Sequence, residues 1–372
     1  WLLYLAVPKG FFPQQDTGIV QVITQAPQNL SFSAMSIRQE NAVKVLLDDP
    51  DVYSVASFIG VDASNPTLNT GRMQIALKPH GARKETVGEI MLRLQDSLAK
   101  VEGMQFYLQP VQDLTVEDRV SRTQYQLTLE TPRMDLLAEW VPRLVERMKQ
   151  IPELADVADD LQNEGLHTYL EIDREAASRL GVTATAITDA LYDAFGQRQV
   201  STIFTQSNQY RVVIETAPQF RQDPSGLGNV YVKTAEGKPV ALTNFARIEQ
   251  GRSPLVINRM GQFPVVTISF NLAPGASLSS AVEKIGQAER EIELPASIQT
   301  RYQGAAQAFE SSLTSTLWLI LAAIVTMYIV LGILYESFIH PVTILSTLPS
   351  AAIGALLALM LTERDLDMIG II

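Results

Sequence analysis

Two long stretches without a formal charge near the C-terminus constrain this chain more than any other feature. Residues 311–335 contain no Asp, Glu, Lys or Arg, and neither do residues 337–362. A helix that spans a bilayer needs about 20 predominantly apolar residues, so each stretch is long enough. A buried core helix is the alternative, but such helices rarely run this far without a charge. We therefore predict transmembrane helices at residues 314–335 and 341–361, joined as a hairpin.

Both ends of the chain are also apolar. Residues 1–7 lack the basic segment and the cleavage site of a signal peptide, and a new apolar run begins near the C-terminal residue. We interpret residues 1–12 as the end of an earlier transmembrane helix and residues 366–372 as the start of a further one. On this interpretation the chain is part of a larger membrane protein, with a large polar domain between its spans.

The first part of the polar domain, residues 13–111, alternates between strand and helix patterns. Apolar residues at helical spacing predict two helices, from Phe32 to Leu46 and from Val87 to Val101. Alternating or β-branched runs predict four strands, at residues 19–26, 52–59, 72–77 and 104–108. The order is βαββαβ, the split βαβ of ferredoxin-like domains.

The same pattern begins again after residue 112 and is then interrupted. A proline followed by a strand closes both first helices, at Pro50 and at Pro152, which indicates a repeated unit. The second half of the repeat appears only after residue 254. The fold class we predict is therefore α+β, with two ferredoxin-like subdomains before a helical hairpin. The second subdomain, residues 112–163 with 254–305, is split by an inserted α/β subdomain at residues 164–253.

Composition and motifs exclude several kinds of protein. The chain has no cysteine, so it has no disulfide, no thiol nucleophile and no cysteine metal site. Its formal charge of -11 disfavours nucleic-acid binding. The three histidines, His80, His167 and His340, are too far apart to indicate a metal site, and no nucleotide-binding or hydrolase motif is present. The sequence predicts no enzyme, no cofactor and no metal.

The motifs of the chain resemble those of one transporter family along its whole length. The residues that carry the likeness are KGFFPQQDTG at 9–18, AASRLGV at 176–182, AFGQRQ at 194–199, LGILYESF at 331–338, LPS at 348–350 and GALLA at 354–358. Together they are similar to the resistance–nodulation–division (RND) efflux transporters. Residues 112–115, 121–125 and 195–198 are most similar to the MdtB-type branch of that family.

The resemblance implies a function and its partners. It implies two porter subdomains, a docking subdomain at residues 164–253, and a location in the inner membrane of a Gram-negative cell with the large domain in the periplasm. The partners it implies are a sister RND subunit in a trimer, a periplasmic adaptor protein, an outer-membrane channel, membrane lipid and amphipathic small molecules such as bile salts. The proton relay of the family lies outside this sequence. A non-transporting assembly subunit, beside a sister chain that carries substrate and protons, is the alternative.

The resemblance also places candidate site residues. A loop beside the drug pocket of the family matches residues 60–70. In and near this loop, Ala56, Val61 and Ala63 stand in place of the phenylalanines of the multidrug exporters. The predicted substrate-binding residues are Phe58, Val61, Ala63, Leu68 and Met73. For Phe58, a position in the core is an equally good interpretation. The predicted partner-contact hairpin is polar at Thr205, Gln206, Ser207, Asn208 and Gln209. A solvated hairpin is the alternative there.

Overall fold

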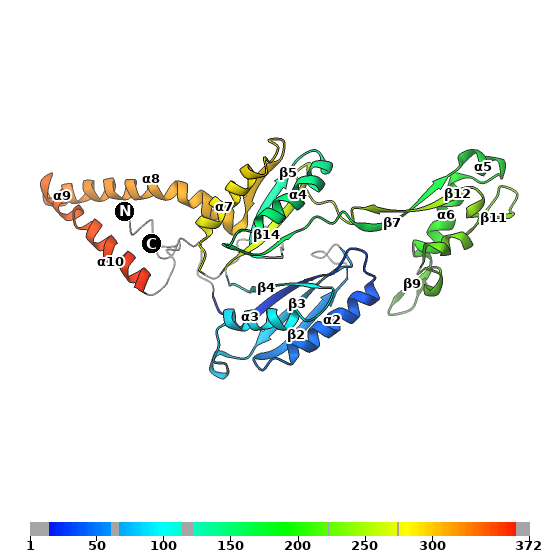
Figure 1. Ribbon diagram of the computed structural model, residues 1–372, viewed down its shortest axis with the longest axis horizontal. Helices are drawn as coiled ribbons and strands as arrows, with labels where there is room; N and C mark the ends of the chain where they lie inside the picture. The colour runs from blue at the N-terminus through cyan, green and yellow to red at the C-terminus, as the bar shows by residue number, and fades with distance from the viewer. Residues whose placement is uncertain (1–14, 61–66, 114–121, 222, 274, 362–372) are drawn as a thin grey trace. The chain divides into compact units, whose positions relative to one another are not determined.

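The computed structural model describes residues 15–60, 67–113, 122–221, 223–273 and 275–361 (Figure 1). The chain divides into two compact units. The first comprises Trp1–Asn163 with Pro254–Ile372, and the second is Glu164–Ser253. The second unit has the bounds of the predicted insertion.

A four-stranded antiparallel sheet begins the first unit, with two helices on one face (Figure 1). Its elements are β1 (Ile19–Gln25), α2 (Phe32–Leu47), β2 (Val52–Ile59), β3 (Thr70–Leu77), α3 (Val87–Leu98) and β4 (Gln105–Pro110). The strand order is β2-β3-β1-β4, and the element order is the βαββαβ that the periodicity predicts. Helix α3 starts at a capping box of Thr86 and Glu89. The core between sheet and helices includes Val22, Ile75 and Leu94.

The second sheet of this unit repeats the first. Its elements are β5 (Tyr125–Glu130), α4 (Met134–Met148), β6 (Leu154–Asp159), β13 (Arg259–Met260), β14 (Phe263–Leu272), α7 (Leu278–Glu291) and β15 (Gln299–Gln303). Strand β14 pairs with both β5 and β6, and β15 pairs with β5, so the order β6-β14-β5-β15 is that of the first sheet. Segments from both sides of the insertion therefore share one apolar core.

The described residues of the second unit form three separate two-stranded ribbons, two α-helices and three short 3-10 helices. Its elements are β7 (Gly165–Ile172), α5 (Arg174–Arg179), α6 (Ala184–Phe195), β8 (Arg198–Phe204), β9 (Gln209–Ile214), β10 (Tyr231–Lys233), β11 (Pro239–Ala241) and β12 (Ala246–Ser253). The pairs are β7 with β12, β8 with β9, and β10 with β11. A small core of its own, which includes Ile187, Val232 and Phe245, holds this unit together.

Removal of the second unit is expected to leave the first one folded. Gly165 pairs directly with Ser253, so the chain leaves and returns at neighbouring positions that a short linker can join. Replacing residues 166–252 by a Gly/Ser linker should change the unfolding free energy of the first unit by less than about 1 kcal/mol. Hydrogen exchange of the backbone amides of α4 and α7, compared between the parent and the shortened chain, measures this change in stability. Rapid exchange in α7 of the shortened chain would show that the insertion is required for the second sheet.

The C-terminal helices differ from the predicted hairpin in their bounds. They are α8 (Gly304–Tyr335), α9 (Ile339–Leu345) and α10 (Leu348–Leu361). Helix α8 begins ten residues before the predicted start at 314 because it follows β15 directly. The predicted helix at 341–361 is broken between α9 and α10, next to Pro349, which has no backbone N–H to continue the first helix. Within the described residues, no helix combines the length and apolar character needed to cross a membrane, so the predicted spans are not confirmed.

Candidate functional site

The face of the first sheet opposite α2 and α3 carries the predicted substrate residue Phe58. Side chains alternate between the two faces of a strand, and Val22, Met73 and Ile75 point into the core. Their neighbours therefore lie on the opposite face. We call these ten residues the outer sheet face: Gln21, Ile23, Gln25, Ala56, Phe58, Arg72, Gln74, Gln105, Tyr107 and Gln109.

Strand pairing aligns the residues of the outer sheet face in rows. Arg72 lies opposite both Phe58 and Ile23, and Ile23 lies opposite Tyr107, which gives one row across four strands. In the next row Gln21 lies opposite both Gln74 and Gln109. Adjacent strands are about 4.8 Å apart, so side chains within a row are immediate neighbours.

The predicted substrate residues have different surroundings. Phe58 is 59% exposed on the outer sheet face, and Leu68 is 48% exposed at the start of the segment before β3. Met73 is 1% exposed in the core beneath α2 and α3, so it does not share the outer sheet face with Phe58. Its place in the alternation of β3 explains this, because Arg72 and Gln74 point outward. Val61 and Ala63 lie outside the described residues.

A buried polar cluster that the sequence did not predict lies on the core side of the same sheet. The hydroxyl of Thr24 donates to Gln39 Oε1 at 2.8 Å, and Gln39 Nε2 donates to the Ser57 hydroxyl at 3.1 Å. A Cβ added at Gly71 would lie 2.8 Å from Thr24 Oγ1, so only glycine fits beside this cluster. The cluster fixes the ends of β1 and β3 close to Phe58.

Part of the outer sheet face is covered by the second sheet. Ile23 and Tyr107 pack against Ala158 of β6 and are buried. Burial raises the pKa of the Tyr107 hydroxyl, and burial also raises the pKa of the Asp159 carboxyl, while the charge of Arg122 opposes both shifts. Arg122 Nε donates to Gln25 Oε1 at 2.6 Å. At the covered end of the outer sheet face, Ile23 and Tyr107 therefore make an apolar contact with Ala158, and the bond of Arg122 to Gln25 lies beside it.

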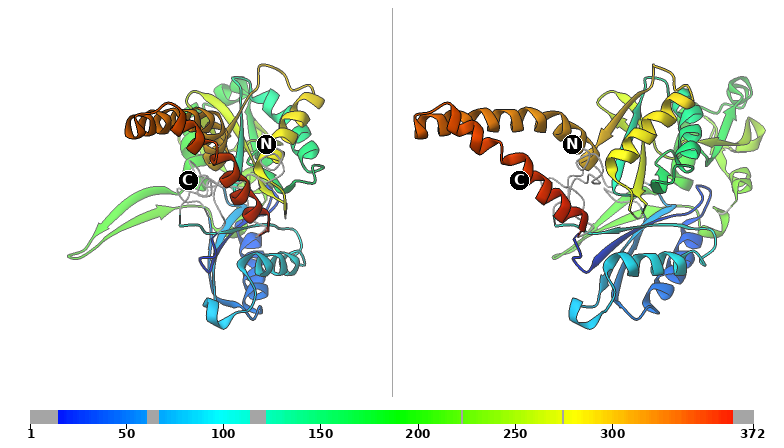
Figure 2. Two further views of the ribbon diagram at one scale, coloured as in Figure 1. Left: turned by 90° about the vertical axis from the view of Figure 1, so that its left-hand side faces the viewer. Right: turned by 60° about the vertical axis from the view of Figure 1, so that its left-hand side comes forward.

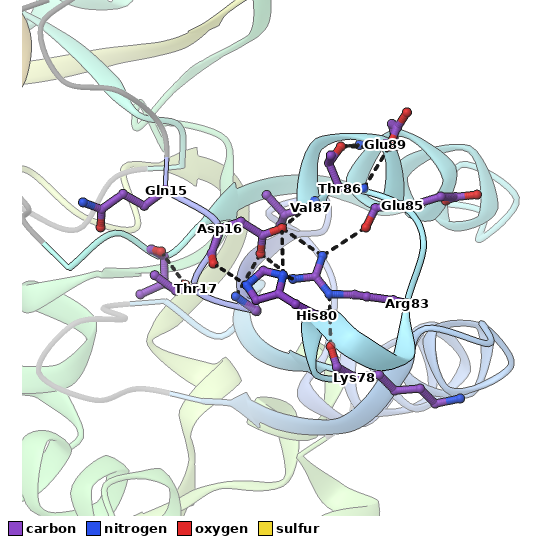
Figure 3. A network of polar contacts seen from close by, with 12 residues as sticks. Gln15, Asp16, Thr17, Lys78, His80, Arg83, Glu85, Thr86, Val87 and Glu89 are labelled. Carbon is purple, nitrogen blue, oxygen red and sulfur yellow. Dashed lines mark hydrogen bonds and ion pairs between the residues drawn. The ribbon is translucent and has the colours of Figure 1, made fainter. Parts of the chain in front are cut away.

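An ion-pair cluster fixes the segment that leads into β1 (Figure 3). The guanidinium of Arg83 donates to both oxygens of Asp16, at 2.6 and 2.9 Å, and the backbone N–H groups of Gly18 and Val87 donate to the same carboxylate at 3.1 Å. The side chain of Arg83 is 2% exposed. The bonds from Arg83 hold the pKa of the Asp16 carboxyl below its usual value, although burial opposes them.

His80 completes this cluster. A guanidinium can only donate, so the 2.9 Å contact of Arg83 to His80 Nδ1 makes that nitrogen the acceptor. The other ring nitrogen, Nε2, then donates to the backbone oxygen of Asp16 at 3.0 Å. Arg83 Nε also donates to the carbonyl of Lys78 at 3.0 Å. Asp16 is thereby joined to the loop before α3 and to the first turn of that helix.

The predicted partner-contact residues form the tip of the β8–β9 ribbon, the long green ribbon in the left view of Figure 2. The backbone N–H of Thr205 donates to Asn208 O at 2.8 Å, and the Thr205 hydroxyl accepts from Asn208 N at 3.0 Å. The tip is a closed turn held by Thr205. Its polar side chains are exposed, as are those of Gln206, Ser207 and Gln209.

The strands of this ribbon carry an apolar surface that the sequence reading missed. Phe204 is 71% exposed, and the directly opposed Ile203 and Tyr210 are each 55% exposed. Val200, Val213 and Ile214 are exposed as well. The signal was the run of three consecutive apolar residues at 212–214, which places apolar side chains on both faces of the strand. Among the described strands β8 and β9 pair only with each other, so these side chains stay in solvent.

Comparison with known proteins decides the family. The family model described as AcrB/AcrD/AcrF matches residues 1–372. The chain belongs to this family of RND efflux transporters. Two solved structures have a similar fold, and both are described as crystal forms of a heavy metal efflux pump. The TM-scores are 0.88 and 0.87 at 19% and 20% sequence identity.

The match with these structures covers 98% of this chain and 38% of each pump chain. At this identity the likeness shows the shared fold alone. Among the described residues of this family member, no group of three or more His, Cys, Asp or Glu side chains is placed to hold a metal ion. The outer sheet face, the Asp16–Arg83 cluster and the β8–β9 ribbon are the candidate functional features among the described residues.

Proposed function

We propose that the chain supplies the porter and docking parts of a proton-driven RND exporter of amphipathic compounds, of the MdtB type. The observation that carries the proposal is the family match over residues 1–372, together with two sheets of identical strand order. On this proposal the two repeats are ferredoxin-like porter subdomains and residues 164–253 are the docking subdomain. Bile salts and drugs are the proposed cargo.

The chemistry of the outer sheet face favours amphipathic cargo over metal ions. Phe58 offers an exposed aromatic ring, and Leu68 offers an exposed aliphatic side chain nearby in sequence. The thioether of Met73, a soft metal ligand by type, is buried in the core. A ring and an aliphatic surface bind the apolar part of a substrate through the hydrophobic effect.

The membrane location predicted for residues 314–335 and 341–361 is part of the same proposal. Leu321, Val330 and Ile333 of α8 are 53%, 57% and 74% exposed. Exposed side chains at these spacings surround the helix, which is typical of a helix whose solvent is not water. We propose an inner membrane of a Gram-negative cell, with the two sheets and the second unit in the periplasm.

The partners follow from the exposed ribbon. We propose that the apolar strands and polar tip of β8–β9 contact a sister RND subunit or the outer-membrane channel, with a periplasmic adaptor completing the complex. A free ribbon with Phe204 and Ile203 exposed is costly in water and gains free energy when covered. The same observation favours the second candidate, an assembly subunit that carries no substrate.

Two variants separate transport from assembly. Phe58→Ala should lower efflux of an amphipathic dye about tenfold, because a buried aromatic contact contributes roughly 1–3 kcal/mol. The measurement is dye accumulation in pump-deficient cells that express the complete protein with its partners. Tyr53→Ala, on the same strand and more exposed, is the matched control and should leave efflux unchanged.

Ile203→Glu places a charge on the apolar ribbon and should abolish recovery of the assembled complex, with Gln219→Glu of the same unit as control. If Phe58→Ala leaves efflux unchanged while Ile203→Glu prevents assembly, the assembly subunit is the correct function. If neither variant has an effect, both proposals fail.

A further inference from the structure

A cavity of about 250 Å³ lies between the end of α4 and the middle of α7, on the second sheet's helices. Its floor is apolar, because Ile151 and Ala288 are only 6% and 1% exposed. This volume lies just below that of cavities for drug-sized ligands, so it suits a small polar molecule. The polar side chains of its rim come from both sides, namely Arg147, Gln150, Glu153, Lys284 and Gln287.

The backbone of the loop after α4 fixes one wall of the cavity. Ile151 N donates to Met148 O at 3.0 Å, and Leu154 N donates to Ile151 O at 3.1 Å, so the loop consists of two successive turns. The carbonyl of Glu153 accepts from Ala273 N at 3.0 Å, which ties the loop to the end of β14. A preformed wall lowers the cost of ordering that binding would otherwise carry.

The charge of Arg147 on this rim is already compensated. Its Nε and Nη2 donate to Glu291 Oε2 at 2.8 and 2.6 Å, and Gln287 Nε2 donates to Glu291 Oε1 at 2.9 Å. The remaining nitrogen of the guanidinium, Nη1, contacts Gln150 Oε1 at 3.4 Å, which is a weak bond. Arg147 is therefore held in place, and its Nη1 can still donate to a bound molecule.

Two other charges of the rim are not compensated. Glu153 is half-buried, and its Oε2 is buried without a hydrogen-bond donor among the described residues. Lys284 lines the same cavity but makes no ion pair or side-chain hydrogen bond with a described residue, and its charge reaches Glu291 only at longer range. A carboxylate shares its charge between two oxygens, so a cation beside the part of Glu153 that faces the cavity offsets the cost of the buried oxygen.

We propose that this cavity binds small zwitterions, which are molecules with a primary ammonium group and an anionic oxygen group a few atoms apart. The ammonium donates to Glu153, and the anionic group accepts from Lys284 and from Nη1 of Arg147. The connecting carbon atoms lie on Ile151. A ligand with a single charge leaves one of the two rim charges uncompensated, so the cavity discriminates against it. The site is separate from the proposed transport function, because zwitterion binding can be measured without efflux.

The test measures binding to the complete chain in a non-ionic detergent by saturation-transfer NMR. The probes are glycerophosphoethanolamine, which has the chemistry of a lipid headgroup, and β-alanine, a free zwitterion. We expect a Kd of about 1 mM for at least one of them. Glu153→Gln and Lys284→Gln should each raise this Kd about tenfold, because each removes one charge-assisted contact. Glu146→Gln and Lys149→Gln are the matched controls, since they change exposed charges near the end of α4 that do not line the cavity.

Binding of either probe, weakened by both charge variants, supports the site. The probe that binds identifies the source of the ligand, a lipid headgroup or a free solute. Glycerophosphocholine has the same phosphodiester but no ammonium N–H, so it should bind about fivefold more weakly than glycerophosphoethanolamine. Lys284→Arg keeps the charge and should retain most of the affinity.

Several results would overturn the site. One is an unchanged Kd in the Glu153→Gln and Lys284→Gln variants. Another is binding of ethanolamine or glycerophosphate, which carry only one kind of charge, as tightly as the zwitterions. An equal loss of affinity in Lys284→Arg and Lys284→Gln would show that the charge is not the cause. Failure of both probes to saturate at about 20 mM, well above the expected Kd, would show that no zwitterion binds and that Lys284 and Glu153 are only surface charges.

Discussion

Replacing Asp16 by Asn is expected to lower the unfolding free energy of the first subdomain by about 3 kcal/mol. The change keeps the shape of the side chain and removes its charge. Arg83 then keeps its guanidinium, with a side chain only 2% exposed, opposite a neutral amide that cannot accept at both positions. A buried charge without its counter-ion is among the largest single-residue costs in proteins.

The effect should be local as well as large. Asp16 accepts from the backbone of Val87, the first residue of α3, so the loop before this helix loses its anchor when the carboxylate is lost. Urea unfolding followed by circular dichroism gives the unfolding free energy. Hydrogen exchange over residues 78–98 shows whether the loss of stability lies in the loop before α3 and in α3 itself. Asp135→Asn is the matched control, since its ion pair with Arg133 is 65% exposed on both sides and is screened by solvent, so its removal should leave the stability nearly unchanged.

The pH dependence has a definite sign. The folded-state pKa of Asp16 lies below its unfolded value, so the ionised carboxyl stabilises the fold above the unfolded pKa. That stabilisation is lost as the pH falls through the lowered folded-state pKa. The free-energy difference between the parent and the D16N variant should therefore be full at pH 7 and shrink in acid. A difference that stays constant from pH 7 to pH 3 would mean that the charge of Asp16 contributes nothing.

Local patterns were sufficient to predict the secondary-structure order of both repeats. Periods of 2 and 3.6 residues, with Pro50 and Pro152 closing the first helices, fix where strands and helices occur. The same alternation predicts that the side chain of Met73 faces the core, because Met73 lies between Arg72 and Gln74 in a strand.

Features that depend on pairing between distant residues could not be predicted. Asp16 and Arg83 are 67 residues apart, and no pattern within either segment indicates that they meet. The row of glutamines depends on the register of three strands, and a shift of one residue would place Gln21 in the core. Ile203 and Tyr210 are exposed because, among the described strands, β8 and β9 pair only with each other. Whether a third strand joins such a ribbon is decided by the pairing of distant segments.

The two halves of the interrupted repeat are held together by Phe270. This side chain of β14 is fully buried and its ring stacks on Tyr125 of β5 with the centroids 5.7 Å apart. Tyr125 precedes the insertion and Phe270 follows it, so their contact joins segments that are 145 residues apart in number. The core around them draws on both halves, including Leu144 of α4 and Ile285 of α7.

Phe270→Ala is therefore expected to lower the unfolding free energy of the second subdomain by about 4 kcal/mol, through lost burial and the cavity that remains. Hydrogen exchange should increase in β5 and α4 as much as in β14 and α7, because all four elements line one core. Phe263→Ala is the control on the same strand, where a side chain 45% exposed should cost less than about 1 kcal/mol. Exchange that increases only after residue 254 would show that the two halves fold independently and that the insertion separates two cores.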